Sequence, residues 1–149
     1  MLSNIVLGFI LPWIAGGLLF KKNPKLVLTI APFAAVIALS TNEFGVFLDF
    51  WDILPKETEF MNCLPLDLGV YPVLGSLFIH FVQRKKLSTW LILFLFSSFT
   101  TVLELTYVLI GKIVYHNGWN ITLTFFSYIL TYTLGLLYYF LLRKHSVLP

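Results

Sequence analysis

The chain has 149 residues, of which 58% are hydrophobic, 17% aromatic and only 11% charged, with a formal net charge of +3. Soluble domains carry about 25% charged residues, and a soluble fold of this length could not keep so much apolar surface away from water. The composition therefore excludes a soluble enzyme, a nucleic-acid-binding module, a disordered regulator and a disulfide-stapled secreted domain. We expect an all-α, polytopic membrane helix bundle that forms a single domain.

Five hydrophobic segments follow one another along the chain, each close to the length of about 20 residues that a membrane span needs. The first has no basic stretch before it and no small-residue cleavage site after it, which predicts a retained span and not a signal peptide. Pro32 in the second is tolerated in a membrane helix, because neighbouring helices satisfy the carbonyl that it frees. The expected spans are 2–20, 26–42, 66–83, 88–111 and 121–142.

The distribution of basic residues predicts the orientation, because short cytoplasmic loops carry the excess of Lys and Arg. If the amino terminus lies outside and the carboxyl terminus in the cytoplasm, only Lys56 and Lys112 of the ten basic residues fall outside. Six of the seven acids then lie in or beside the outer loop. The cytoplasmic set is Lys21, Lys22, Lys25, Arg84, Lys85, Lys86, Arg143 and Lys144.

Residues 41–65 are too polar to span a membrane, yet part of this segment has helical spacing. One alternative is an amphipathic helix that lies at the outer interface between the second and third spans, with Trp51 at headgroup depth. The other is that the second span continues to about Leu48. The apolar positions at helical spacing are Phe44, Phe47, Leu48 and Trp51.

Glu104 is the acid inside the fourth segment. It follows the start of that segment by about 16 residues, so at ~1.5 Å per residue it lies ~24 Å from the inner boundary, in the outer third of the bilayer. An ionised side chain in hydrocarbon costs roughly 2.5 kcal/mol or more, so we expect Glu104 to contact a polar side chain of the third or fifth segment. It is either a ligand, proton or ion site or a structural residue bonded to Ser, Thr or Tyr.

Polar faces of the third, fourth and fifth segments predict one outward-facing pocket that binds a ligand. Its expected members are Asp67, Tyr71, Glu104, Tyr107, Ser127 and Tyr128. The connection between the fourth and fifth segments lies above it and adds three candidates at the outer mouth, namely His116, Asn117 and Trp119. Plainer alternatives are a helix N-cap for Asp67 and a solvated loop position for His116. No catalytic residue, metal site or cofactor is expected, and the single cysteine, Cys63, excludes an intramolecular disulfide.

Short motifs from the second segment onward carry a resemblance to a known family. They are Leu48-Asp49, the stretch 67–72, Glu104, Gly111, the stretch 115–119, and Ser127-Tyr128. In these the chain resembles an uncharacterised family of small, about five-span integral membrane proteins of spore-forming Gram-positive bacteria. The resemblance implies a location in the bacterial plasma membrane or the spore membrane. It implies no activity, cofactor or catalytic residue.

Three functions remain open. The first is a non-enzymatic membrane protein that binds a small solute, ion or lipid in the outward pocket or acts as a subunit of a membrane assembly. The second is a small oligomeric transporter or channel, although the apolar inner half of the fifth segment, 136–142, counts against a path through one protomer. The third is an intramembrane enzyme that uses Asp67 and Glu104 as acid and base. The expected partners are the lipid bilayer and either a second copy or another membrane protein, with no nucleic acid.

Overall fold

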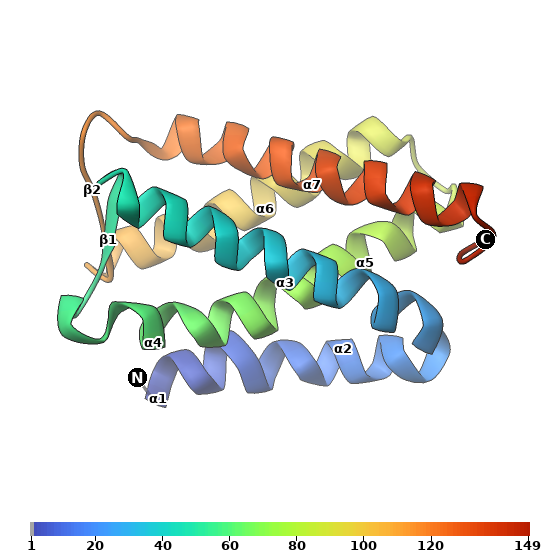
Figure 1. Cartoon of the computed structure of the whole chain (residues 1–149), viewed down its shortest axis with the longest axis horizontal. Helices are drawn as coiled ribbons and strands as arrows, with labels where there is room; N and C mark the ends of the chain where they lie inside the picture. The colour runs from blue at the N-terminus through green and yellow to red at the C-terminus, as the bar shows by residue number, and fades with distance from the viewer. Residues whose placement is uncertain (1) are drawn as a thin grey trace.

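The computed structural model of the chain describes residues 2–149, and the side chains of residues 4–56, 58 and 61–149. Long helices run up and down beside one another, with the amino terminus near a two-stranded sheet at one end and the carboxyl terminus at the other end (Figure 1). The helices are α1 (Leu2–Ile5), α2 (Leu11–Lys22), α3 (Pro24–Phe47), α4 (Glu59–Pro65), α5 (Tyr71–Arg84), α6 (Thr89–Leu109) and α7 (Ile121–Lys144), with π-helices at Val6–Ile10 and Leu66–Val70 and a 3-10 turn at Lys56–Thr58. The strands are β1 (Trp51–Ile53) and β2 (Ile113–Tyr115).

Four helical stretches among the described residues are long and apolar enough to cross a membrane, namely Pro24–Phe47, Met61–Arg84, Thr89–Leu109 and Ile121–Lys144. Large apolar side chains point outward along them. Trp90 is 76% exposed and Leu109 is 77% exposed at opposite ends of α6. Such a surface suits hydrocarbon and not water, so the chain is an all-α, multi-pass membrane protein.

The first hydrophobic segment is not one of these four. The π-helix Val6–Ile10 divides it, which leaves α2 with 12 residues. The segment nevertheless lies along α4 and α5 and reaches from one end of the bundle to the other (Figure 1). The five-span count therefore remains a prediction.

The structure takes the second alternative for residues 41–65. Helix α3, which contains the second expected span, runs on to Phe47, and a separate interfacial amphipathic helix is not confirmed. After the helix the chain turns at Asp49, whose φ is 54°, and returns as β1. The indole of Trp51 then lies on Gly45, where a Cβ would be only 1.9 Å from the ring. Strand β1 pairs antiparallel with β2, with Trp51 opposite Tyr115.

The two π-helices lie against each other where the first segment meets the third. A Cβ on Gly69 would be 2.0 Å from the carbonyl oxygen of Gly8, so a glycine permits this approach of the two backbones. Pro72 lacks the N–H that an α-helix would offer to the Leu68 carbonyl. The indole Nε1 of Trp13 donates to that carbonyl instead, at 2.8 Å. The first segment is thus hydrogen-bonded to the third through the Leu68 carbonyl, which Pro72 leaves without its usual backbone donor.

Apolar and polar layers divide the bundle along its length. The half near the basic helix ends contains a closed apolar core, which includes Leu26, Ile30, Phe78 and Ile79. The end with β1 and β2 has a smaller apolar cluster around Trp51. Buried polar side chains from the π-helix Leu66–Val70, α6 and α7 lie between these two layers, and they include Asp67, Ser97, Thr100 and Thr124.

The contact between the π-helices predicts the effect of adding a methyl group. Gly69→Ala should lower the free energy of unfolding by about 1–3 kcal/mol, because the Cβ overlaps backbone that no rotamer change can move. Gly17→Ala is the matched control, since a Cβ there meets nothing within 4 Å. Thermal unfolding in detergent measures both variants. Equal melting temperatures would contradict this account of the crossing.

Candidate functional site

The carboxylate of Glu104 accepts three hydrogen bonds from hydroxyl groups. Oε1 accepts from Tyr115 at 2.6 Å and from Thr124 at 3.1 Å, and Oε2 accepts from Tyr128. Tyr115 belongs to β2, whereas Thr124 and Tyr128 belong to α7. The expected contact between Glu104 and a polar side chain of the fifth segment is confirmed.

Further hydrogen bonds extend the network to other elements. The hydroxyl of Tyr71 on α5 lies 3.2 Å from that of Tyr128. The indole Nε1 of Trp119 donates to Oγ1 of Thr124 at 2.9 Å. Glu104 on α6 is therefore linked, through one or two hydrogen bonds, to α5, to α7, to β2 and to the connection that precedes α7.

The beginning of α7 explains why its donors face Glu104. The side chain of Asn120 accepts from the backbone N–H groups of Thr122 and Leu123, which is the usual helix N-cap. Helix periodicity then places Thr124 and Tyr128 one turn apart on the same face. The Asn120 N-cap thus fixes where α7 begins, and with it which residues of α7 point toward α6.

A cavity of about 80 Å³ adjoins Glu104 between α3, α5 and α7. Glu104 is the one charged residue of the described residues that line it. Most of its walls are aromatic or small side chains. The aromatic ones are Phe33, Trp51, Tyr71, Phe78, Trp119, Tyr128 and Tyr132. The site is thus a narrow, largely apolar crevice with one carboxylate at its wall.

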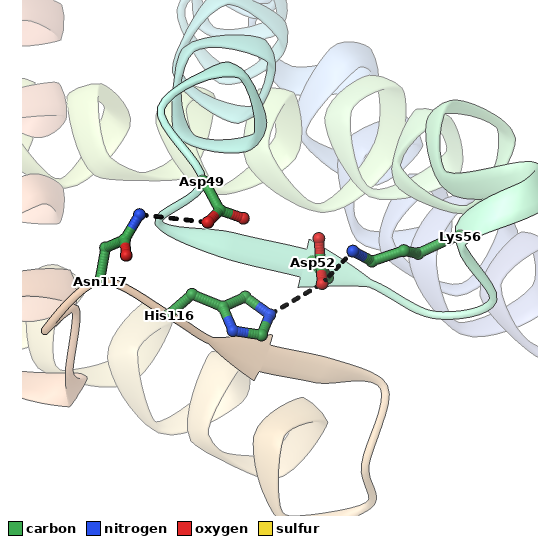
Figure 2. A network of polar contacts seen from close by, with 5 residues as sticks. All are labelled: Asp49, Asp52, Lys56, His116 and Asn117. Carbon is green, nitrogen blue, oxygen red and sulfur yellow. Dashed lines mark hydrogen bonds and ion pairs between the residues drawn. The ribbon is translucent and has the colours of Figure 1, made fainter.

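Strands β1 and β2 form a cap over this end of the bundle, and polar side chains fasten it (Figure 2). Asp52 lies between Lys56 and His116, with its Oδ2 at 2.7 Å from Nζ of Lys56 and at 2.7 Å from Nε2 of His116. Asn117 Nδ2 donates to Oδ2 of Asp49 at 3.1 Å. These bonds join the loop after α3 to the loop before α7, from which Trp51 and Trp119 reach the cavity.

Two groups of the cap have shifted pKa values. The hydrogen bond from Lys56, assisted by that from His116, holds the pKa of Asp52 below its ordinary value despite an opposing effect of burial. Burial raises the pKa of Tyr115, and the neighbouring Glu104 carboxylate raises it further. Tyr115 therefore stays protonated and remains a donor to Glu104.

Five of the residues predicted for the site line the cavity. They are Tyr71, Glu104, Ser127, Tyr128 and Trp119. His116 and Asn117 instead form hydrogen bonds within the cap, to Asp52 and Asp49 respectively. Tyr107 lies beneath Lys112, whose Nζ is 5.5 Å from the centre of its ring. Tyr107 and Glu104 also line a second, more apolar groove of about 440 Å³ between the first segment, α5 and α6.

Asp67 lies apart from the Glu104 network. Its side chain is only 1% exposed, and Oδ1 accepts from Nδ2 of Asn42 on α3 at 2.6 Å. Its Oδ2 has no hydrogen-bond partner among the described residues. Asp67 and Glu104 share no hydrogen-bond partner in the described part of the chain. Asp67 is therefore not a lining residue of the cavity beside Glu104, although Asn42, which binds it, lines that cavity.

Sequence reasoning did not assign four residues that define the site, namely Asn42, Trp51, Tyr115 and Thr124. The polar face of the fifth segment already contained Thr124, so its signal was present. Tyr115 and Trp51 reach the site through the pairing of two three-residue strands, which leaves almost no pattern in the sequence. Asn42 depends on the extension of α3 to Phe47.

No protein-family model, curated protein or solved structure matches the chain. The resemblance to small membrane proteins of spore-forming bacteria therefore remains a prediction. Among the residues whose side chains are described, no group of three or more His, Cys, Asp and Glu is placed to hold a metal ion.

The pKa of Asp52 predicts how the cap responds to acid. A carboxyl whose pKa is lowered in the folded state stabilises that state above its unfolded pKa, and this stabilisation disappears as the pH falls through the folded pKa. The melting temperature of the unaltered chain should therefore begin to fall below about pH 5 and continue to fall as the pH drops through the lowered pKa of Asp52. Asp52→Asn should melt at a lower temperature at neutral pH and lose less on acidification. Parallel curves for the two proteins would contradict the assigned role of Asp52.

Proposed function

We propose that this chain is an integral membrane protein that binds a small solute or ion at Glu104. The observation that carries the proposal is the Glu104 carboxylate itself, held by three hydroxyl groups at the wall of a cavity inside an apolar bundle. Acids within membrane spans are costly and are usually kept for a ligand, an ion or a proton. A purely structural acid would need the hydrogen bonds but not the adjoining cavity.

The architecture favours binding over conduction and catalysis. Below the cavity, the rings of Phe33 and Tyr138 stack at 4.0 Å, and the apolar core continues to the basic helix ends. A path for a polar solute through one protomer would have to cross that core. Catalysis by Asp67 and Glu104 as a pair needs both groups at one substrate, and their hydrogen-bond partners are different.

We further infer five spans with the amino terminus outside and the carboxyl terminus in the cytoplasm, in a bacterial plasma or spore membrane. Two observations support counting the first hydrophobic segment as a fifth span, in addition to the four long apolar helices. Asn4 at one end of the first segment accepts from Lys112 near the cap at 2.6 Å, whereas Lys22 ends the segment at the opposite end of the bundle. Leu7, Leu11, Ile14 and Leu18 point outward along it, as expected for a face in contact with lipid.

Glu104→Gln tests the binding proposal. A panel of small cations, anions and neutral solutes is added to the detergent-solubilised protein, and thermal unfolding is followed. At least one solute should raise the melting temperature of the unaltered chain, because a ligand of the native state stabilises it, and the same solute should have little effect on Glu104→Gln. Glu43→Gln is the control, since it removes the same charge at an exposed position of α3. Equal shifts in all three proteins, or no shift with any solute, would overturn the proposal.

Cysteine labelling in intact cells tests the orientation. In a Cys63→Ser background, Thr58→Cys should react with an impermeant thiol reagent, because this exposed residue lies at the cap end. Lys86→Cys and Arg143→Cys, exposed at the other end, should react only after the cells are opened. Labelling of Arg143→Cys from outside would reverse or exclude the proposed topology.

A further inference from the structure

We propose that the ligand of the Glu104 cavity is a small organic ammonium ion of about the size of choline. This inference rests on the proposed function and names the chemical class of its ligand. Three properties of the cavity carry it: the charge of its lining, the aromatic character of its walls and its volume.

The charge of the lining selects a cation. Glu104 is the one ionisable acid among the described lining residues, and the lining contains no Lys, Arg or His. Asp52 in the cap forms ion pairs with Lys56 and His116, whereas Glu104 forms none with the described side chains. The Glu104 carboxylate is held by hydrogen bonds from hydroxyl groups, which carry no positive charge. An anionic ligand would meet a like charge there, whereas a cation would meet an unpaired opposite one.

The walls select an organic cation over a metal ion. Trp51 and Trp119 meet at 4.9 Å between ring centres, and Tyr71 and Tyr128 lie at 6.2 Å. These two pairs adjoin Glu104, Tyr128 by a direct hydrogen bond and Trp119 through Thr124. One face of Trp119 stacks on Phe50 at 4.8 Å. Aromatic rings that line a cavity beside a carboxylate attract alkylated ammonium groups through cation–π interactions. Hard metal ions are bound by several oxygen ligands, commonly with more than one carboxylate, and Glu104 is the one carboxylate among the described lining residues.

The volume sets the size of the ligand. A cavity of about 80 Å³ is much smaller than the roughly 300–1,000 Å³ of pockets for drug-sized molecules, so a large lipophilic cation does not fit in it. Choline is a small alkylated ammonium compound and serves as the probe. The ammonium group of a phosphatidylcholine headgroup shares this chemistry, but it brings a phosphate for which the lining offers no basic side chain. We therefore assign the free ammonium compound.

Calorimetric titration of the full chain in phosphatidylglycerol nanodiscs tests the assignment. The probes are choline, its neutral isostere 3,3-dimethylbutanol, and glycerophosphocholine as the soluble equivalent of the lipid headgroup. Choline should bind at least about tenfold more tightly than either of the others, which corresponds to about 1.4 kcal/mol. Glu104→Gln should weaken choline binding at least tenfold, and Glu43→Gln should leave it unchanged.

A second pair of variants tests the aromatic wall without changing any charge. Trp119→Phe keeps an aromatic face, whereas Trp119→Leu removes it. The phenylalanine variant should retain most of the choline affinity, and the leucine variant should lose several-fold more. Equal affinities of these two variants would contradict a cation–π site. This comparison decides the matter even if Glu104→Gln does not fold.

The remaining outcomes separate this inference from the function on which it rests. Equal binding of choline and its isostere, or no binding of choline, overturns the ammonium assignment. If another solute then stabilises the chain in a Glu104-dependent manner, the proposed function stands with a different ligand. If no solute does so, both fail. Binding of glycerophosphocholine as tight as that of choline would assign the site to a lipid headgroup and overturn the free compound.

Discussion

A carboxylate inside a membrane bundle must receive its hydrogen bonds from the protein, because hydrocarbon offers none. Glu104 receives them from Tyr115, Thr124 and Tyr128. These donors come from β2 and from two successive turns of α7, so their positions relative to α6 are constrained together. The need to hydrogen-bond the Glu104 carboxylate thus constrains how α6, α7 and β2 are arranged relative to one another, and not α6 alone. It also explains why polar side chains gather between the apolar core and the cap.

The cap completes this arrangement at the end of the bundle where β1 and β2 pair. Its two short strands bring Tyr115 to Glu104 and place Trp51 on Gly45. Strands of three residues have little stability of their own. The contacts of Asp52 with Lys56 and His116 add bonds across the two loops. Because the same cap carries two tryptophans of the cavity wall, its stability and access to the carboxylate are linked.

The parts of this fold that follow from local rules could be predicted from the sequence. Hydropathy and helix length predict the long helices, and a rise per residue predicts that Glu104 and Tyr128 lie at similar depth. Features that depend on contacts between distant segments could not be predicted. The hydrogen bond from Asn42 to Asp67 depends on the extension of α3. The place of Tyr115 depends on pairing between strands some sixty positions apart, for which three residues provide no pattern.

The coupling between Glu104 and Tyr128 tests the central claim most directly. A double-mutant cycle with Glu104→Ala and Tyr128→Phe, measured by unfolding in detergent, isolates their interaction energy. Glu104→Ala with Tyr138→Phe is the control cycle, because Tyr138 lies on the same helix and stacks on Phe33. The account predicts a coupling of about 1–3 kcal/mol for Tyr128 and less than about 0.5 kcal/mol for Tyr138. Additive effects of Glu104 and Tyr128 would show that the carboxylate does not hold α6 to α7, and would contradict the account.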